Sequence, residues 1–283
     1  MKYYIVDAFT DKTFGGNPAG VVLLGQDAPF PGEKLMQQVA AELSHSETAF
    51  VQQNGPATFT VRYFTPCSEV DLCGHATIAT FGLLHTLGMV AADAVCELRT
   101  LAGSLEVKAG QQVMMQMVKP QVIVPLIDVD YLHDMMAGSG SAEWNDLPVE
   151  VISTGLPDII MPVATVEGLN ALKPDMEALT ELSRELNVVG VHAFALSDDG
   201  YTAHVRNFAP LYGVPEESAT GTANAALNYY LYRRARVAYS QECRFKQGEV
   251  MGRPSVVVTT MRHDGLVYVG GHSAIVASGE LMV

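Results

Sequence analysis

The sequence is poor in cysteine and in positive charge, and it has no long hydrophobic run. Its four cysteines form no Cys-x-x-Cys pair and are too few for a disulfide framework, so we expect reduced thiols. Seventeen Lys and Arg against 31 Asp and Glu give a formal net charge of -14 without a dense basic run, which argues against nucleic acid and membranes as partners. No apolar stretch approaches membrane-spanning length, and the first residues lack the pattern of a signal peptide. We therefore expect a cytoplasmic protein.

The chain contains an internal copy of part of itself. Residues 62–66 read Arg-Tyr-Phe-Thr-Pro, and residues 206–210 read Arg-Asn-Phe-Ala-Pro. Each tract is followed by an apolar helix pattern that opens with glycine, at Gly74 and at Gly221. A repeat of this kind predicts two pseudo-symmetric domains with a cleft between them.

The domain boundary is placed by the segment that has no counterpart. Residues 118–144 match nothing elsewhere in the chain, so we expect them to hold the crossover between the halves. The first repeat domain is then residues 1–120 and the second is residues 121–271. The last segment, residues 272–283, can pack back on the first domain.

Hydrophobic periodicity predicts a strand-rich chain with few helices. The helix expected over residues 74–88 has almost no polar face, so protein must surround it on all sides. A small half-domain achieves this by wrapping sheet around the helix, which predicts an α+β fold with a barrel-like curved sheet around a central helix in each domain. We expect strands at 3–9, 21–24, 47–52, 58–64, 95–99, 104–108 and 113–118, and further helices at 33–43 and 223–236.

The two glycine-led helix starts are candidate anion-binding sites. The first turn of a helix has backbone N–H groups without intrahelical partners and carries a partial positive charge. Gly74 and Gly221 would therefore hold the carboxylate of a small acidic molecule. The alternative interpretation is that both glycines only permit tight turns.

Two side chains in the first half are replaced in the second half. Glu47 stands opposite Val191, and His75 stands opposite Thr222. A carboxylate held away from water can both give and take a proton near neutral pH, which is the property of a general acid/base. His75 at a helix N-terminus would act as a neutral hydrogen-bonding group or proton relay. The alternatives are an exposed or salt-bridged glutamate and a structural histidine.

Metal binding and thiol chemistry are both disfavoured by the sequence. His45, His75 and His85 lack the spacing of a zinc motif, and no cysteine or carboxylate completes one, so we expect no metal site. Cys73, before a helix start, could be an acidified thiol of a two-cysteine racemase. Thr220 stands at the equivalent position in the second half, so the second thiol is absent. We expect Cys73 to pack as a small side chain.

Seven tracts, taken in order, resemble the motifs of the phenazine biosynthesis PhzF-like family. The match runs almost from end to end of the chain. Its tracts are Gly-Asn-Pro-Ala-Gly-Val at 16–21, Ser-Glu-Thr-Ala-Phe at 46–50, Arg-Tyr-Phe-Thr-Pro at 62–66, Cys-Gly-His-Ala-Thr at 73–77, Phe-Ala-Pro at 208–210, Ala-Thr-Gly-Thr-Ala at 219–223, and residues 247–255.

This resemblance implies a diaminopimelate-epimerase-like fold with the active site in the interdomain cleft, and a homodimer. It also implies a cofactor-free isomerase, because the founding member shifts a proton in a dihydro-hydroxyanthranilate. Glu47 would move the proton and His75 would assist. The predicted substrate-binding residues are Ser46, Gly74, Glu217, Gly221 and Thr222.

One tract departs from the family pattern. The family commonly reads Glu-Asp-Pro before Ala-Thr-Gly, whereas Glu216, Glu217 and Ser218 stand here. The carboxylate is one methylene longer and the turn has lost its proline, so the resemblance does not fix the substrate. Our hypothesis is a cofactor-independent isomerase acting on a small acidic metabolite. An amino-acid racemase or epimerase, and a binding protein that has lost catalysis, are the alternatives.

Overall fold

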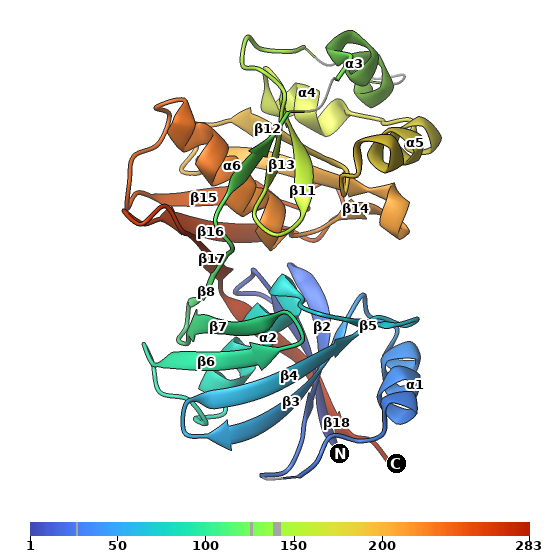
Figure 1. Ribbon diagram of the computed structural model, residues 1–283, viewed down its shortest axis with the longest axis vertical. Coiled ribbons are helices and arrows are strands. Elements are labelled where there is room, and N and C mark those ends of the chain that lie inside the picture. The colour runs from blue at the N-terminus through green and yellow to red at the C-terminus, as the bar shows by residue number, and fades with distance from the viewer. Residues whose placement is uncertain (27, 125–126, 138–142) are drawn as a thin grey trace. The chain divides into compact units, whose positions relative to one another are not determined.

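The computed structural model describes residues 1–26, 28–124, 127–137 and 143–283. The chain divides into two compact units. Unit 1 comprises residues 1–116 and 270–283, and unit 2 comprises residues 117–269. Each unit has an α+β architecture in which a mixed sheet packs against helices (Figure 1). No helix within the described residues is both long and apolar enough to cross a membrane.

The sheet of unit 1 combines antiparallel neighbours with two parallel pairs. β2 lies parallel to β3, and β4 lies parallel to β6, while β1 pairs antiparallel with both β2 and the C-terminal β18. The C-terminal strand thus joins the first strand of the chain. The elements are β1 (Lys2–Ala8), β2 (Asn17–Leu23), α1 (Glu33–Leu43), β3 (Thr48–Gly55), β4 (Thr58–Phe64), β5 (Glu69–Val70), α2 (Gly74–Thr86), β6 (Val95–Thr100), β7 (Gly103–Lys108), β8 (Val113–Gln116) and β18 (Ser273–Glu280).

Helix α2 is the buried helix of unit 1. Ten of its 13 residues are buried, and it packs against β1, β2, β3, β8 and β18 (Figure 1). Its lack of a polar face follows from this position, because strands lie on several sides of it. Helix α1 is amphipathic instead and buries only Met36, Val39 and Ala40, and Ser44 ends it in the left-handed conformation, with φ of 54°.

Unit 2 pairs its strands in the same order as unit 1. β11 lies parallel to β12, β13 lies parallel to β15, and β10–β11, β12–β13 and β15–β16 are antiparallel. The elements are β9 (Gln121–Ile123), α3 (Val129–Ala137), β10 (Glu150–Ser153), β11 (Pro157–Pro162), α4 (Val166–Ala171), α5 (Met176–Leu186), β12 (Val191–Leu196), β13 (Ala203–Ala209), the 3-10 turn η1 (Pro210–Tyr212), β14 (Val214–Glu217), α6 (Gly221–Arg233), β15 (Glu242–Gln247), β16 (Ser255–Met261) and β17 (Val267–Gly271), whose last residues lie in unit 1.

Helix α6 is the buried helix of unit 2. It packs against β10, β11 and β16, and nine of its 13 residues are buried. Tyr230, fully buried, meets the ring of Phe194 edge-on at a centroid distance of 5.5 Å. The exposed hydrophilic end of the helix, with Arg233 in its last turn, explains its more mixed sequence.

Two stretches differ from the sequence-based expectations. Residues 118–144 were expected only to connect the halves, but they contain β9 and α3. The apolar side of α3 packs into the core of unit 2 through Leu132, Met135 and Met136. Periodicity did not indicate these elements because a three-residue strand and a nine-residue helix contain few repeats of the pattern. Strand β2 begins at Asn17, before the expected start at residue 21, because Asn17 pairs with Ala8 of β1.

Candidate active site

Glu47 lies directly before β3 and not within it. Its backbone carbonyl accepts a hydrogen bond from Gly20 N at 3.0 Å, which fixes the residue beside β2. A Cβ at Gly20 would stand 2.6 Å from the Thr48 hydroxyl, so only glycine permits this approach. The Glu47 side chain is 20% exposed and therefore neither fully buried nor a free surface group.

His75 is the second residue of α2, and a hydrogen-bonded chain fixes the start of this helix. The hydroxyl of Thr77 donates to the carbonyl of Cys73 at 2.7 Å, and the buried Tyr63 hydroxyl lies 2.6 Å from the Thr77 hydroxyl. Burial raises the pKa of Tyr63, so this phenol stays protonated. The His75 ring, 7% exposed, is thereby held at a defined place.

The structure brings the two predicted catalytic side chains together. Glu47 Oε2 lies 3.2 Å from His75 Nε2, and Ser46 Oγ lies 3.5 Å from the same nitrogen. Glu47 Oε2 is a buried atom that makes no hydrogen bond to any residue the structure describes, so the 3.2 Å contact lacks hydrogen-bond alignment. Such contacts often tighten only when substrate binds. The pair can exchange a proton with a bound molecule.

Cys73 also reaches His75, which the sequence did not indicate. Its Sγ lies 3.4 Å from His75 Nδ1, and the reactive atoms of Glu47, Cys73 and His75 all lie within 4.8 Å of one another. The expectation of no metal site concerned a cysteine or carboxylate at zinc-motif spacing, and this cluster does not depend on such a spacing. Glu47 is far from Cys73 in sequence, and no spacing motif relates them.

The tight-turn interpretation does not account for Gly74. Its φ lies outside the left-handed region, and an added Cβ would meet only Met115 Cε, at 3.8 Å. Neither the backbone conformation nor a close contact requires glycine here. What the missing side chain provides is an open approach to the first N–H groups of α2.

In unit 2, the predicted binding residues lie at the start of α6 and the turn before it. Gly221 and Thr222 open the helix, and Glu217 ends β14. The Thr222 carbonyl accepts a hydrogen bond from the Thr154 hydroxyl at 2.8 Å. The Thr220 hydroxyl donates to Glu217 Oε2 at 3.1 Å, so this carboxylate is held against the helix start.

Gln247 supports this turn, which has Ser218 in place of the family's proline. Its side-chain oxygen accepts from Thr220 N at 3.1 Å, and its Nε2 donates to the Glu217 carbonyl at 2.9 Å. The Ser255 hydroxyl donates to the carbonyl of Ser218 at 2.7 Å. The turn is thus fixed by side chains from β15 and β16.

A buried polar cluster in unit 2 was missed by the sequence analysis. Asn207 Nδ2 lies 3.3 Å from Asp158 Oδ1 and 3.3 Å from His192 Nδ1, and all three residues are at most 1% exposed. Burial, with a smaller contribution from the negative charge of Glu217, raises the pKa of Asp158 to about 7. Burial lowers the pKa of His192 to about 3. One signal was available, because the amide Asn207 stands where the aromatic Tyr63 stands in the other copy of the repeated tract.

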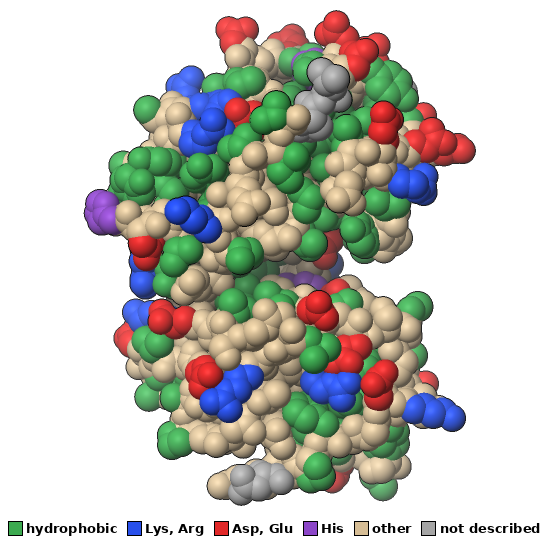
Figure 2. All heavy atoms as spheres, in the orientation of Figure 1, with side chains coloured by type: hydrophobic (Ala, Val, Ile, Leu, Met, Phe, Trp, Pro, Cys, Tyr) green, Lys and Arg blue, Asp and Glu red, His purple; other side chains and the backbone are tan. Residues whose placement is uncertain are grey.

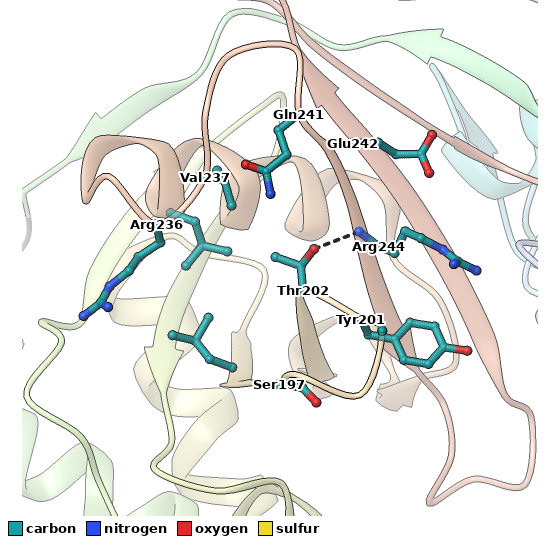
Figure 3. A pocket seen from close by; sticks show the side chains of 11 residues that line it. Ser197, Tyr201, Thr202, Arg236, Val237, Gln241, Glu242 and Arg244 are labelled. Atoms are coloured by element: carbon teal, nitrogen blue, oxygen red, sulfur yellow. Dashed lines mark hydrogen bonds between the residues drawn. The ribbon is translucent and has the colours of Figure 1, made fainter.

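A pocket of about 420 Å³ in unit 2 contains none of the predicted site residues. Figure 3 shows its Arg236 and Arg244 side chains pointing away from each other, so they do not converge on an anion. Thr202 accepts a hydrogen bond from the backbone N–H of Arg244 at 3.0 Å across it. On the face shown in Figure 2, basic side chains are scattered among acidic ones and form no continuous patch.

Known proteins match this chain over nearly its whole length. The model of the PhzC-PhzF family, phenazine biosynthesis-like protein, matches residues 6–279. An uncharacterized isomerase of Deinococcus radiodurans is 34% identical to this chain, and the match covers 98% of this chain and 94% of that protein. The trans-2,3-dihydro-3-hydroxyanthranilate isomerase of Pseudomonas aeruginosa is 31% identical to this chain, and the match covers 99% of this chain and 98% of that protein.

A solved structure agrees with the sequence relatives. The crystal structure of the Bacillus anthracis phenazine biosynthesis protein, PhzF family, superposes with a TM-score of 0.87 at 27% identity, over 100% of this chain and 99% of that one. The α+β fold with its mixed sheet is therefore the fold of this family. The protein is an enzyme of the isomerase class and belongs to the phenazine biosynthesis-like family.

Proposed function

We propose that the protein is a cofactor-independent isomerase that shifts a proton within a small carboxylate-bearing substrate. The contact of 3.2 Å between Glu47 Oε2 and His75 Nε2 is the observation that carries this proposal. A glutamate with one unbonded buried oxygen beside an imidazole has the composition of a general acid/base pair.

The proposed reaction needs one group that both removes and returns a proton. The Glu47 carboxylate takes a proton from a substrate carbon, and the electron pair of that C–H bond moves into the adjoining conjugated system. Glu47 then gives the same proton to another carbon, so substrate and product have the same composition. His75 and Ser46, both near the same position, orient the carboxyl group and hydrogen-bond the substrate.

The helix starts supply the proposed carboxylate binding. Gly74 leaves the first turn of α2 open. Gly221 and Thr222 are the first residues of α6, whose N–H groups would bind the carboxylate from the second half. Glu217, bonded to Thr220, would contact a donor group on the substrate. Location of the substrate in a cleft between the two halves stays a prediction from the sequence.

The substrate named for the Pseudomonas aeruginosa relative is a small carboxylate-bearing molecule of the class that we propose. The altered turn at residues 216–218 bears on which member of that class this protein uses. A glutamate in place of aspartate at position 217 moves the carboxylate by about one methylene. We therefore propose a small acidic metabolite whose donor group is placed differently.

We also propose that the two units are pseudo-symmetric copies with a diaminopimelate-epimerase-like arrangement, and that the protein is a homodimer. The common pairing order of β1–β4 with β6 and β7, and of β10–β13 with β15 and β16, supports the first proposal. The dimer rests on the family resemblance alone, and light scattering after gel filtration tests it.

Amino-acid racemisation is the second candidate. Cys73 Sγ at the start of α2, 3.4 Å from His75 Nδ1, favours it because a thiol there could become a thiolate base. Thr220 occupies the corresponding place before α6, so a second thiol is missing from the pair that such chemistry uses. Deuterium uptake at an amino-acid α-carbon would distinguish this reaction from a proton shift between carbons.

The test is proton NMR in heavy water with trans-2,3-dihydro-3-hydroxyanthranilate, other small unsaturated acids and amino acids. We expect exchange or product formation with the wild type and a loss of at least about 100-fold in Glu47→Gln. Glu42→Gln, which changes an exposed glutamate five residues upstream, is the matched control and should retain the rate. Equal rates in both variants would refute the role of Glu47. No turnover of any compound, with unchanged ligand binding in Glu47→Gln, would favour a binding protein.

A further inference from the structure

Three different metal-binding side chains converge at the start of α2. Glu47, Cys73 and His75 each place one donor atom within 4.8 Å of the others. Glu47 Oε2 lies 3.2 Å from His75 Nε2, and Cys73 Sγ lies 3.9 Å from that nitrogen. Carboxylate oxygen, imidazole nitrogen and thiolate sulfur are the three donor types that bind zinc in proteins.

The spacing of these atoms suits a tetrahedral ion. Zinc bonds of about 2.0–2.3 Å at tetrahedral angles place neighbouring donors roughly 3.4–3.6 Å apart. The two distances at His75 Nε2, 3.2 and 3.9 Å, lie on either side of that range. Cys73 Sγ also lies 3.4 Å from His75 Nδ1. Binding of one ion at Nε2 therefore requires the Cys73 side chain and the imidazole to rotate, so that the sulfur comes to lie on the Nε2 side of the ring.

A second observation points to a ligand at this place. Glu47 Oε2 is a buried atom, yet it makes no hydrogen bond to any described residue. Burial of a carboxylate oxygen without a hydrogen bond is unfavourable, and a cation bound there would offset that cost. The rigid start of α2, held by Tyr63, Thr77 and the Cys73 carbonyl, keeps the other two donors in place.

We propose that Glu47, Cys73 and His75 form an inhibitory zinc site with three protein ligands. Binding of Zn²⁺ to the thiol forms one Zn–S bond and releases one proton to solvent, while the carboxylate and imidazole bind through lone pairs. The fourth position is open to water or to a substrate carboxylate. The consequence for activity rests on the proposed function, because the lone pairs that bind zinc are those that Glu47 and His75 would use on substrate. The binding itself does not rest on it.

The experiment is a titration of the protein with Co²⁺, which replaces zinc in such sites and absorbs light. We expect one tightly bound Co²⁺ with a near-ultraviolet sulfur-to-cobalt charge-transfer band. The band should vanish in Cys73→Ser and persist in Cys67→Ser, which removes an exposed cysteine. Glu47→Gln should weaken Co²⁺ binding by at least about tenfold and keep the band at saturation.

A variant-free measurement keeps the proposal testable if Cys73→Ser does not fold. X-ray absorption of the zinc-loaded wild type should show one sulfur at about 2.3 Å and the remaining ligands at about 2.0–2.1 Å. Only nitrogen and oxygen ligands, a cobalt band that survives Cys73→Ser, or no bound metal at one equivalent would each overturn the site. Where NMR identifies a substrate, Zn²⁺ should abolish exchange and a chelator should restore it. Full exchange in the zinc-loaded protein would overturn the inhibition but leave the isomerase proposal intact.

Discussion

The buried carboxyl of Asp158 should make the stability of unit 2 depend on pH. Its side chain is 0% exposed, and burial raises its pKa from 3.8 to about 7. The folded chain therefore keeps the proton more tightly than the unfolded chain does. The stability that this provides is fully present below pH 3.8 and is lost as the pH rises through 7.

The size of this effect follows from the shift. About three pKa units at roughly 1.4 kcal/mol each give about 4 kcal/mol between the low-pH and high-pH limits. Between pH 5 and pH 8, which are accessible to experiment, linkage gives about 2–3 kcal/mol. Asp158→Asn keeps the shape of the side chain and its contact with Asn207 but cannot ionise.

Urea denaturation of the wild type and Asp158→Asn at pH 5 and pH 8 measures the effect. We expect the free energy of unfolding of the variant, relative to the wild type, to rise by about 2–3 kcal/mol between pH 5 and pH 8. Asp146→Asn changes an exposed aspartate of the same unit and should show no such rise. A difference between wild type and Asp158→Asn that is the same at both pH values would refute the reasoning.

Three further predictions concern the stability of the two units. Burial lowers the pKa of His192 from 6.5 to about 3, so the folded chain keeps this side chain neutral as the pH falls. In urea denaturation, His192→Gln should therefore reduce the loss of unfolding free energy between pH 7 and pH 5 by about 2 kcal/mol. An equal loss in the variant and the wild type would contradict this. Gln247→Ala should cost about 1–3 kcal/mol by the same assay, since Thr220 N and the Glu217 carbonyl lose their partner, and a cost below about 0.5 kcal/mol would contradict it. Ile78→Ala in α2 should cost about 2–5 kcal/mol because the side chain is 0% exposed; calorimetry would measure it, and an unshifted melting temperature would oppose it.

Local patterns predicted the regular elements well where the patterns were long. The helix at residues 33–43 has the bounds of α1, and the strand at 58–64 has those of β4. The buried character of α2 was also predictable, because a helix without a polar face has no side that can face water. The short β9 and α3 were not predictable, since pairing with β10 and packing on the core of unit 2 stabilise them more than their own sequences do.

For the candidate site, the repeat provided the choice of residues and the fold provided their distances. Glu47 and His75 were chosen because the second half replaces them by Val191 and Thr222. Their roles, and those of the binding residues, stay predictions. Cys73 is close to His75 in sequence, but the meeting of Glu47 with both of them was not predictable from spacing, because it depends on the loop before β3 lying against the start of α2.

The sequence by itself determined the family and the helix starts and predicted which side chains react, because these inferences depend on residue order and on local periodicity. Only the tertiary structure decided which side chains meet. It placed the donor atoms of Glu47, Cys73 and His75 within 4.8 Å of one another. It also buried Asp158, His192 and Asn207 in one cluster. Contacts between residues distant in sequence depend on strand register and on packing around a helix, and burial then sets the protonation of the groups that are brought together.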